Sequence, residues 1–174
     1  MPDLKSIPDG VKWRLAAQLA ALLPALYDTA YRGVVGEKYD EIEQEIWMTI
    51  SYLVLDIVRD LSLPTGNARE IADSLQTVMT VLFGPEYKSE TLEISNEGAV
   101  ALVKRCPLPA SRVDSASGDL STFHKCMALT LFTVPQLNKS YSARFVRTMC
   151  TGDRQCEIKI EPGNLPDKDG FRKK

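Results

Sequence analysis

The hydrophobic pattern of the chain changes its period at Gly84-Pro85, and this change constrains the fold more than any other feature. Before it, apolar residues recur every three or four positions, as one face of an α-helix requires. After it, short stretches alternate polar and apolar residues, as in half-buried strands. Helices followed by strands predict an α+β fold. With 174 residues, 44% of them hydrophobic, the chain is long enough for one domain with a substantial core.

Three helices are expected before the change of period. They cover 11–31, about 37–61, and the segment from Asn67 to Gly84. Asn67 followed by Glu70 resembles a capping box, Gly33 ends the first pattern, and Pro24 predicts a kink in it. The apolar stripe expected to face the core from the second helix consists of Ile42, Ile46, Ile50, Val54, Ile57 and Leu61, widened by Trp47, Leu53 and Val58.

The second half predicts two β-hairpins with one helix between them. The ranges are 90–104 for the first hairpin, 120–133 for a helix halted by Pro135, and 143–160 for the second hairpin. A Pro- and Ser-rich loop fills 108–118. We expect a single domain over 1–161, with a helical part (1–85) and a cysteine-bearing part (86–161), followed by a flexible tail over 162–174.

Charge and targeting patterns limit the compartment and the partners. The run from Leu15 to Leu26 superficially resembles a signal peptide, but Gln18 and Pro24 interrupt it. The sequence contains no run of about 18 apolar residues, the length that a membrane span needs. A net charge of −2 argues against general nucleic-acid binding. We therefore expect a cytoplasmic protein without nucleic-acid or membrane partners, whose cysteines are thiols or metal thiolates.

All four cysteines lie in the second half of the chain. Cys106 ends the first hairpin, Cys126 lies in the last helix, and Cys150 and Cys156 flank the turn of the second hairpin. If that turn pairs Cys150 with Cys156, their side chains share a face, with Cα atoms about 4.5–5.5 Å apart. Four converging thiolates suit zinc or an iron–sulfur cluster. The alternative is that these residues are small buried hydrophobes, as free cysteines commonly are.

The segment from Cys106 to Ile160 resembles the end of a 4-vinyl reductase-type small-molecule-binding domain. The resemblance lies in Cys150-Thr-Gly-Asp-Arg-Gln-Cys156 followed by alternating Glu-Ile-Lys-Ile. The helical first half, followed by a strand ending in Cys106-Pro107, is also similar to proteins of the L-2-amino-thiazoline-4-carboxylate hydrolase-like group. The first resemblance implies a zinc ion beside a small-molecule pocket, held by Cys126, Cys150 and Cys156. The family's glutamate is replaced by Arg147, so Cys106 would be the fourth ligand.

These observations predict a metal-thiolate domain that binds a small apolar or aromatic ligand, with a mainly structural metal. One alternative is an iron–sulfur protein that transfers single electrons, and another is a hydrolase of the thiazoline-carboxylate group. We expect the ligand pocket between the last helix and the sheet. The apolar residues near the cysteines that could line it are Phe123, Met127, Phe132, Phe145 and Met149.

Three further patterns complete the predictions. His124, the only histidine, precedes Cys126 by two residues, which on a helix turns it about 200° away and weakens a Cys–His nucleophile. The acidic residues of 37–45 are expected on a solvated helix face. The long apolar stripes of the N-terminal helices predict association with a second copy of the chain.

Overall fold

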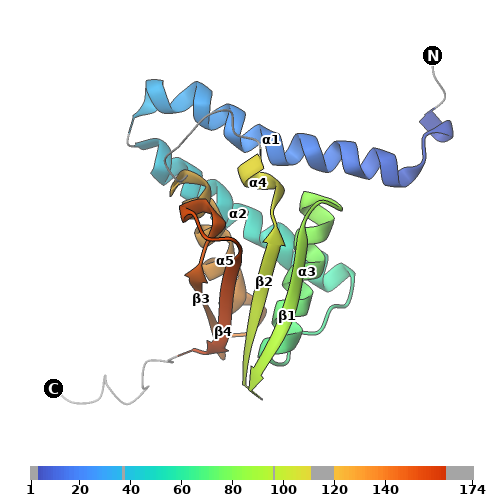
Figure 1. Cartoon of the computed structure of the whole chain (residues 1–174), viewed down its shortest axis with the longest axis vertical. Helices are drawn as coiled ribbons and strands as arrows, with labels where there is room; N and C mark the ends of the chain where they lie inside the picture. The colour runs from blue at the N-terminus through green and yellow to red at the C-terminus, as the bar shows by residue number, and fades with distance from the viewer. Residues whose placement is uncertain (1–3, 37, 96, 111–119, 164–174) are drawn as a thin grey trace.

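The computed structural model describes residues 4–36, 38–95, 97–110 and 120–163. Within them, helices and strands succeed one another as the change of period predicts, and the α+β class is confirmed (Figure 1). The main elements are α1 (Asp9–Val35), α2 (Lys38–Asp60), α3 (Ala68–Phe83), β1 (Lys88–Ser95), β2 (Gly98–Arg105), α4 (Pro107–Ala110), α5 (Leu120–Leu137), β3 (Tyr141–Arg147) and β4 (Cys156–Pro162). Two short 3₁₀ turns, η1 (Leu4–Ser6) and η2 (Met149–Thr151), complete them.

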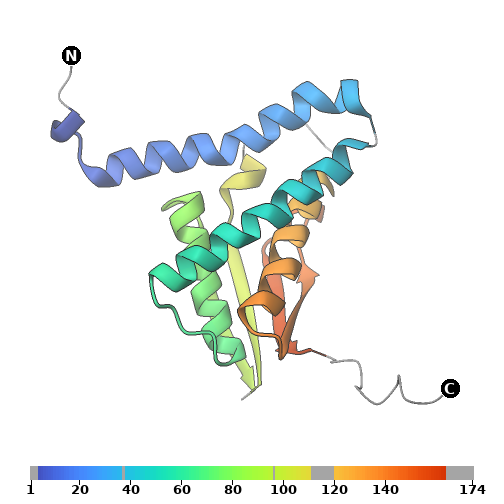
Figure 2. The same ribbon diagram turned by 180° about the vertical axis from the view of Figure 1, so that it is seen from behind.

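The four strands form one antiparallel sheet in the order β1-β2-β4-β3. Its centre is the β2–β4 pair, in which Ala101 lies opposite Ile158. Helices α2, α3 and α5 cover one face of the sheet, and α1 crosses the end of this helical layer (Figure 2). The core lies between helices and sheet, where Ile71, Val78, Val134 and Ile160 are fully buried.

Helix α3 begins and ends where the sequence predicts, because local interactions fix both of its ends. Asn67 Oδ1 accepts a hydrogen bond from the Glu70 N–H at 2.9 Å, and Glu70 Oε2 accepts one from the Gly66 N–H at 2.7 Å. The helix stops at Gly84, whose φ of 82° favours glycine. A Cβ on Gly84 would lie 2.6 Å from Ala17 Cβ, so the end of α3 also sets how closely α1 approaches.

Helix α2 buries a different face from the one that its isoleucines predict. Ile42, Ile46 and Leu61 are each about half exposed. The prediction is confirmed for Trp47, Val54 and Val58, which are buried, and wrong for the exposed residues, because α2 has apolar residues on two sides and α3 and α5 cover only one of them. The buried face carries Tyr39, Glu43, Trp47, Ser51, Val54 and Val58.

The helix ends differ from the predicted ones at two places. α1 continues past Gly33 to Val35, and Gly36, with φ of 69°, follows it. α5 incorporates Pro135 and ends at Leu137. The predicted tail lies outside the described residues from 164 onward, and so do residues 111–118 of the predicted loop. None of the described helices is long and apolar enough to cross a membrane.

Candidate functional site

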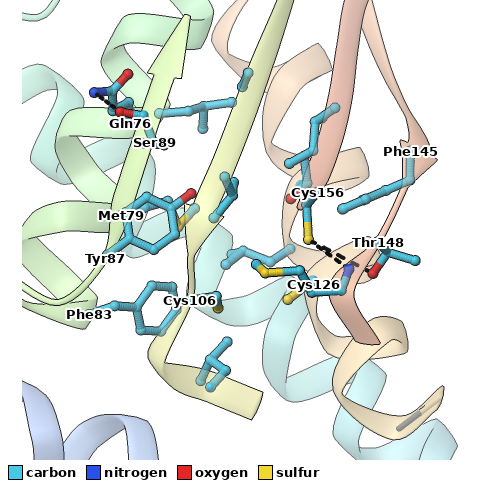
Figure 3. A pocket seen from close by; sticks show the side chains of 18 of the residues that line it. Gln76, Met79, Phe83, Tyr87, Ser89, Cys106, Cys126, Phe145, Thr148 and Cys156 are labelled. Atoms are coloured by element: carbon cyan, nitrogen blue, oxygen red, sulfur yellow. Dashed lines mark hydrogen bonds between the residues drawn. The ribbon is translucent and has the colours of Figure 1, made fainter. Parts of the chain in front are cut away.

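The most distinctive site is an internal cavity of about 60 Å³ between α3, α5 and the inner face of the sheet. It lies where the sequence places a pocket, between the last long helix and the strands. Helix α3 contributes one side, including Met79 and Phe83, and the sheet contributes Ala101 and Ile158 (Figure 3). Of the predicted lining residues, Phe145 and Met149 face the cavity, whereas Phe123, Met127 and Phe132 do not.

All four cysteines line this cavity. Cys106 follows the last residue of β2, Cys126 projects from α5, Cys150 lies in η2, and Cys156 begins β4. They reach the cavity from four separate elements, so only the packing of helix against sheet brings them to its wall. Figure 3 shows Cys106 beside Phe83, and Cys126 and Cys156 farther toward β3.

The turn between Cys150 and Cys156 is shaped by its Gly-Asp pair. Gly152 adopts a left-handed conformation with φ of 105° and returns the chain, its N–H donating to Met149 O at 3.1 Å. Asp153 Oδ2 accepts a hydrogen bond from the Thr148 N–H at 2.9 Å. The Met149 N–H donates to Cys156 Sγ at 3.3 Å, so the turn also fixes the position of that sulfur.

Cys150 and Cys156 do not face each other across this turn, contrary to expectation. The β3–β4 ladder ends at the pair Arg147–Glu157, and Cys156 lies opposite Val103 of β2 instead. The segment between the strands forms the 3₁₀ turn η2, which takes Cys150 out of the strand register. The predicted pairing of Cys150 with Cys156 required a regular hairpin. The residues of η2 lie between the two strands, so the hairpin is not regular.

The predicted metal-thiolate function is wrong on this geometry. In the described part of the chain, no group of three or more His, Cys, Asp or Glu side chains is placed to hold a metal ion. The four cysteines line one cavity without forming such a group, so neither the zinc role nor the electron-transfer alternative finds its ligand set among the described residues. The choice between zinc and an iron–sulfur cluster as cofactor stays a prediction of the sequence alone.

The thiols are suited to an apolar wall rather than to nucleophilic chemistry. Burial raises the pKa of the Cys106 thiol to about 12, helped by the nearby sulfurs of Cys156 and Cys150. Burial also raises the pKa of Cys126 well above its usual range. Because the thiolate is the reactive form, both side chains are neutral and weakly nucleophilic at neutral pH.

His124 offers these thiols no help. It is exposed on the side of α5 that faces α2, beside a groove lined by Asp40, Glu43 and Lys125, whereas Cys126 faces the cavity. The helical offset between the two residues predicts this separation. The hydrolase alternative therefore lacks a Cys–His pair among the described residues.

A few polar groups interrupt the apolar lining. Burial raises the pKa of Tyr87 far above its usual value, and the neighbouring Ser89 hydroxyl partly offsets this effect. Ser89 Oγ is itself buried and makes no hydrogen bond of good geometry within the described residues, while the Gln76 side-chain amide donates to Ser89 O at 2.8 Å. Figure 3 shows Gln76 and Ser89 together at the β1 side of the cavity, away from Cys126 and Cys156.

Sequence reasoning missed a buried ion pair next to this site. Lys125 Nζ lies 2.9 Å from Glu43 Oε1, with 4% and 8% of the two side chains exposed, and the Tyr39 hydroxyl donates to the same oxygen at 3.3 Å. The expectation that the acidic residues of 37–45 are all solvated is therefore wrong for Glu43. The burial of Glu43 could have been predicted from its position, because it lies four residues from both Tyr39 and Trp47, the two aromatic residues of the buried face.

A second hollow lies on the outer side of α2. It is an open groove of about 700 Å³ between α1 and α2, closed at one end by the last residues of α3. Its lining is almost wholly apolar and includes Leu23, Tyr27 and Tyr31 of α1 and Ile42 and Ile46 of α2. The two exposed isoleucines of α2, Ile42 and Ile46, therefore line this groove.

No protein-family model matches the sequence, and no curated protein matches it. The resemblance to 4-vinyl reductase-type domains thus stays a prediction from the sequence. Among solved structures, the fold is similar to that of a trafficking protein particle complex subunit 3 from Naegleria fowleri, described as covalently bound to palmitic acid. The TM-score is 0.55 at 13% identity, over 89% of this chain and 97% of that chain. The match shows the fold.

Proposed function

We propose that this protein is a small-molecule-binding domain that holds a fatty acyl chain non-covalently in the cysteine-lined cavity. The observation that carries the proposal is the cavity itself, which is lined mainly by apolar side chains from α3, α5 and the sheet together with the four cysteines. The subunit of similar fold is described as covalently bound to palmitic acid, which supports an aliphatic ligand. The raised pKa values of Cys106 and Cys126 support non-covalent binding at these two thiols.

The proposal is tested by filling the cavity. Ala101 faces it from β2, so Ala101→Leu adds three carbon atoms to the space that the ligand would use. Val100→Leu is the matched control because adjacent residues of a strand point to opposite faces, and Val100 does not line the cavity. Binding of a fluorescent long-chain fatty acid should be at least about tenfold weaker in Ala101→Leu than in the unaltered protein and unchanged in Val100→Leu. Equal binding by both variants would place the ligand elsewhere, and no binding by the unaltered protein would refute the proposal.

The non-covalent part has its own measurement. The protein is incubated with palmitoyl coenzyme A, whose thioester can acylate an ionised thiol, and its mass is then measured under denaturing conditions. Because the pKa values of Cys106 and Cys126 are raised, we expect no acyl group on either residue at pH 7. An added mass of one acyl group would show that one of the cysteines is acylated.

We also propose that two copies of the chain associate through α1. Four leucines of this helix, Leu15, Leu19, Leu22 and Leu26, follow a four-three-four spacing, which is the a/d repeat of a coiled coil. All four are exposed, and none of them lines the groove between α1 and α2. No charged residue interrupts the helix between Leu15 and Tyr27, so no like charges oppose the pairing of two such seams.

Sedimentation velocity across micromolar concentrations tests this association. Leu19→Glu together with Leu22→Glu puts two carboxylates into the seam and should give a monomer. Ala16→Glu adds an exposed carboxylate outside the seam and should leave the dimer intact. A monomeric unaltered protein over the whole range would refute the proposal.

A further inference from the structure

The internal cavity alone is small for the ligand class proposed above. At about 60 Å³ it is smaller than the roughly 150 Å³ cavity that holds benzene in an engineered protein core. The groove between α1 and α2, at about 700 Å³, falls in the range of about 300–1,000 Å³ typical of ligand sites. A ligand that used both spaces would need a connection between them.

Two residues line both spaces, Trp47 of α2 and Phe83 at the end of α3. Each therefore presents one side to the cysteine-lined cavity and another to the groove. Figure 3 shows Phe83 on the cavity side, next to Cys106 and below Tyr87. The two hollows are thus neighbours that share a wall of two aromatic side chains.

Phe83 is the less buried part of this wall. Trp47 lies in the middle of α2, is 5% exposed and belongs to the core cluster. Phe83 is the last residue of α3 and is only half-buried, and the chain leaves the helix directly after it at Gly84. A change in the Phe83 rotamer would connect the two spaces without disturbing the sheet.

We propose that one extended acyl chain occupies both spaces, passing between Trp47 and Phe83, with its methyl end in the cysteine-lined cavity and its polar head in the groove. This inference rests on the proposed function and adds to it a ligand shape and an entry route. The methyl end enters first because a carboxylate would lose its hydration among the apolar residues of the cavity. The groove keeps the head near solvent, since it is open along its length.

Chain length then becomes the experimental variable. Saturated fatty acids of eight and sixteen carbons are measured by displacement of a fluorescent fatty acid from the full chain. An eight-carbon acid is short enough to lie in the groove alone, whereas a sixteen-carbon acid on the proposed route also buries its methyl end in the inner cavity. Each methylene newly buried is worth about fourfold in affinity, so the unaltered protein should bind the longer acid at least about tenfold more tightly.

Two variants should remove the extra affinity for the sixteen-carbon acid while leaving the groove in place. Phe83→Trp enlarges the shared wall, and Ala101→Leu fills the inner cavity. Both should weaken binding of the sixteen-carbon acid by at least about tenfold and change that of the eight-carbon acid little. Val81→Phe is the control, because it adds an aromatic ring near the same end of α3 at an exposed residue that lines neither space.

The outcomes separate this inference from the proposed function. If neither acid binds, both fail. If both acids bind and Phe83→Trp affects them equally, or not at all, the chain does not pass Phe83 and only this inference is overturned. Sedimentation with and without the sixteen-carbon acid completes the test. If the dimer no longer binds the acid, a second copy of the chain fills the groove. That result would also overturn the inference that one acyl chain occupies both spaces.

Discussion

Lys125 Nζ and Glu43 Oε1 form a buried ion pair, 2.9 Å long, that joins α5 to α2. The pair links the two helices that carry the cavity residues Cys126 and Trp47, and therefore helps to hold these two sides of the cavity together. Burying two charges costs solvation energy that their attraction offsets only when both partners are present.

Removing one partner of this pair should be costly. Lys125→Met leaves Glu43 without its buried cation, and we expect a loss of about 3–5 kcal/mol in unfolding free energy. The double variant Lys125→Met/Glu43→Leu should recover most of it, because both charges are then gone. Urea denaturation measures both, with Arg59→Met as a control at the exposed Arg59–Asp56 pair, where less than about 1 kcal/mol is expected. A Lys125→Met variant as stable as Arg59→Met would contradict the structural role.

Gly84→Ala should destabilise the contact between α1 and α3. The φ of 82° at this position costs a non-glycine residue about 1–2 kcal/mol, and the added Cβ would meet Ala17 Cβ at 2.6 Å, a clash that costs about 1–3 kcal/mol more. Gly152→Ala is the control, because its φ is 105° but its Cβ would meet open space. In a double-mutant cycle with Ala17→Gly, the clash should appear as a coupling energy between residues 17 and 84. Additive effects would mean that α1 does not pack there.

The raised thiol pKa values predict that stability falls in alkaline solution. Above the usual cysteine pKa of 9.0 the unfolded chain releases the protons of Cys106 and Cys126, whereas the folded chain retains them. Each thiol therefore lowers stability by up to about 1.4 kcal/mol per pH unit above about pH 9, a window that for Cys106 extends to about pH 12, and its full contribution is present below that window. Urea unfolding at several pH values should show this slope, and Cys106→Ala should reduce it by one thiol's share. An unchanged slope would show that Cys106 titrates normally in the folded protein.

Asn67→Ala should weaken the start of α3. The Asn67 side chain accepts the Glu70 N–H at 2.9 Å, and loss of such a cap costs about 0.5–2 kcal/mol. Asn67→Asp keeps the acceptor and should remain close to the unaltered protein in thermal unfolding. If Asn67→Ala and Asn67→Asp lost equal stability, the cap would not be what fixes this helix end.

The sequence determined the elements of this fold where the information is local. Asn67, Glu70 and Gly84 set the ends of α3 because caps are hydrogen bonds and backbone angles within one turn. Alternation set the strands for the same reason, since neighbouring side chains of a strand must point to opposite faces. The placement of the pocket between the last long helix and the sheet followed from these elements and agrees with the cavity.

Local sequence did not determine which of the two apolar faces of α2 enters the core. Ile42 and Ile46 satisfy a helical stripe as well as Trp47 and Val58 do, and only contact with α3 and α5 decided which face entered the core. Glu43 was unexpected there because its stabilising partner, Lys125, comes from a helix far along the chain.

The cysteines show the same division. Their concentration in the second half marked Cys106, Cys126, Cys150 and Cys156 as one site, and in the structure all four line one cavity. What they do there depends on where their sulfurs point, and the 3₁₀ turn at Met149–Thr151 removes the pairing that the metal hypothesis required. Residue type and spacing determine which side chains are available, but only tertiary packing decides whether they converge on a point or surround a space.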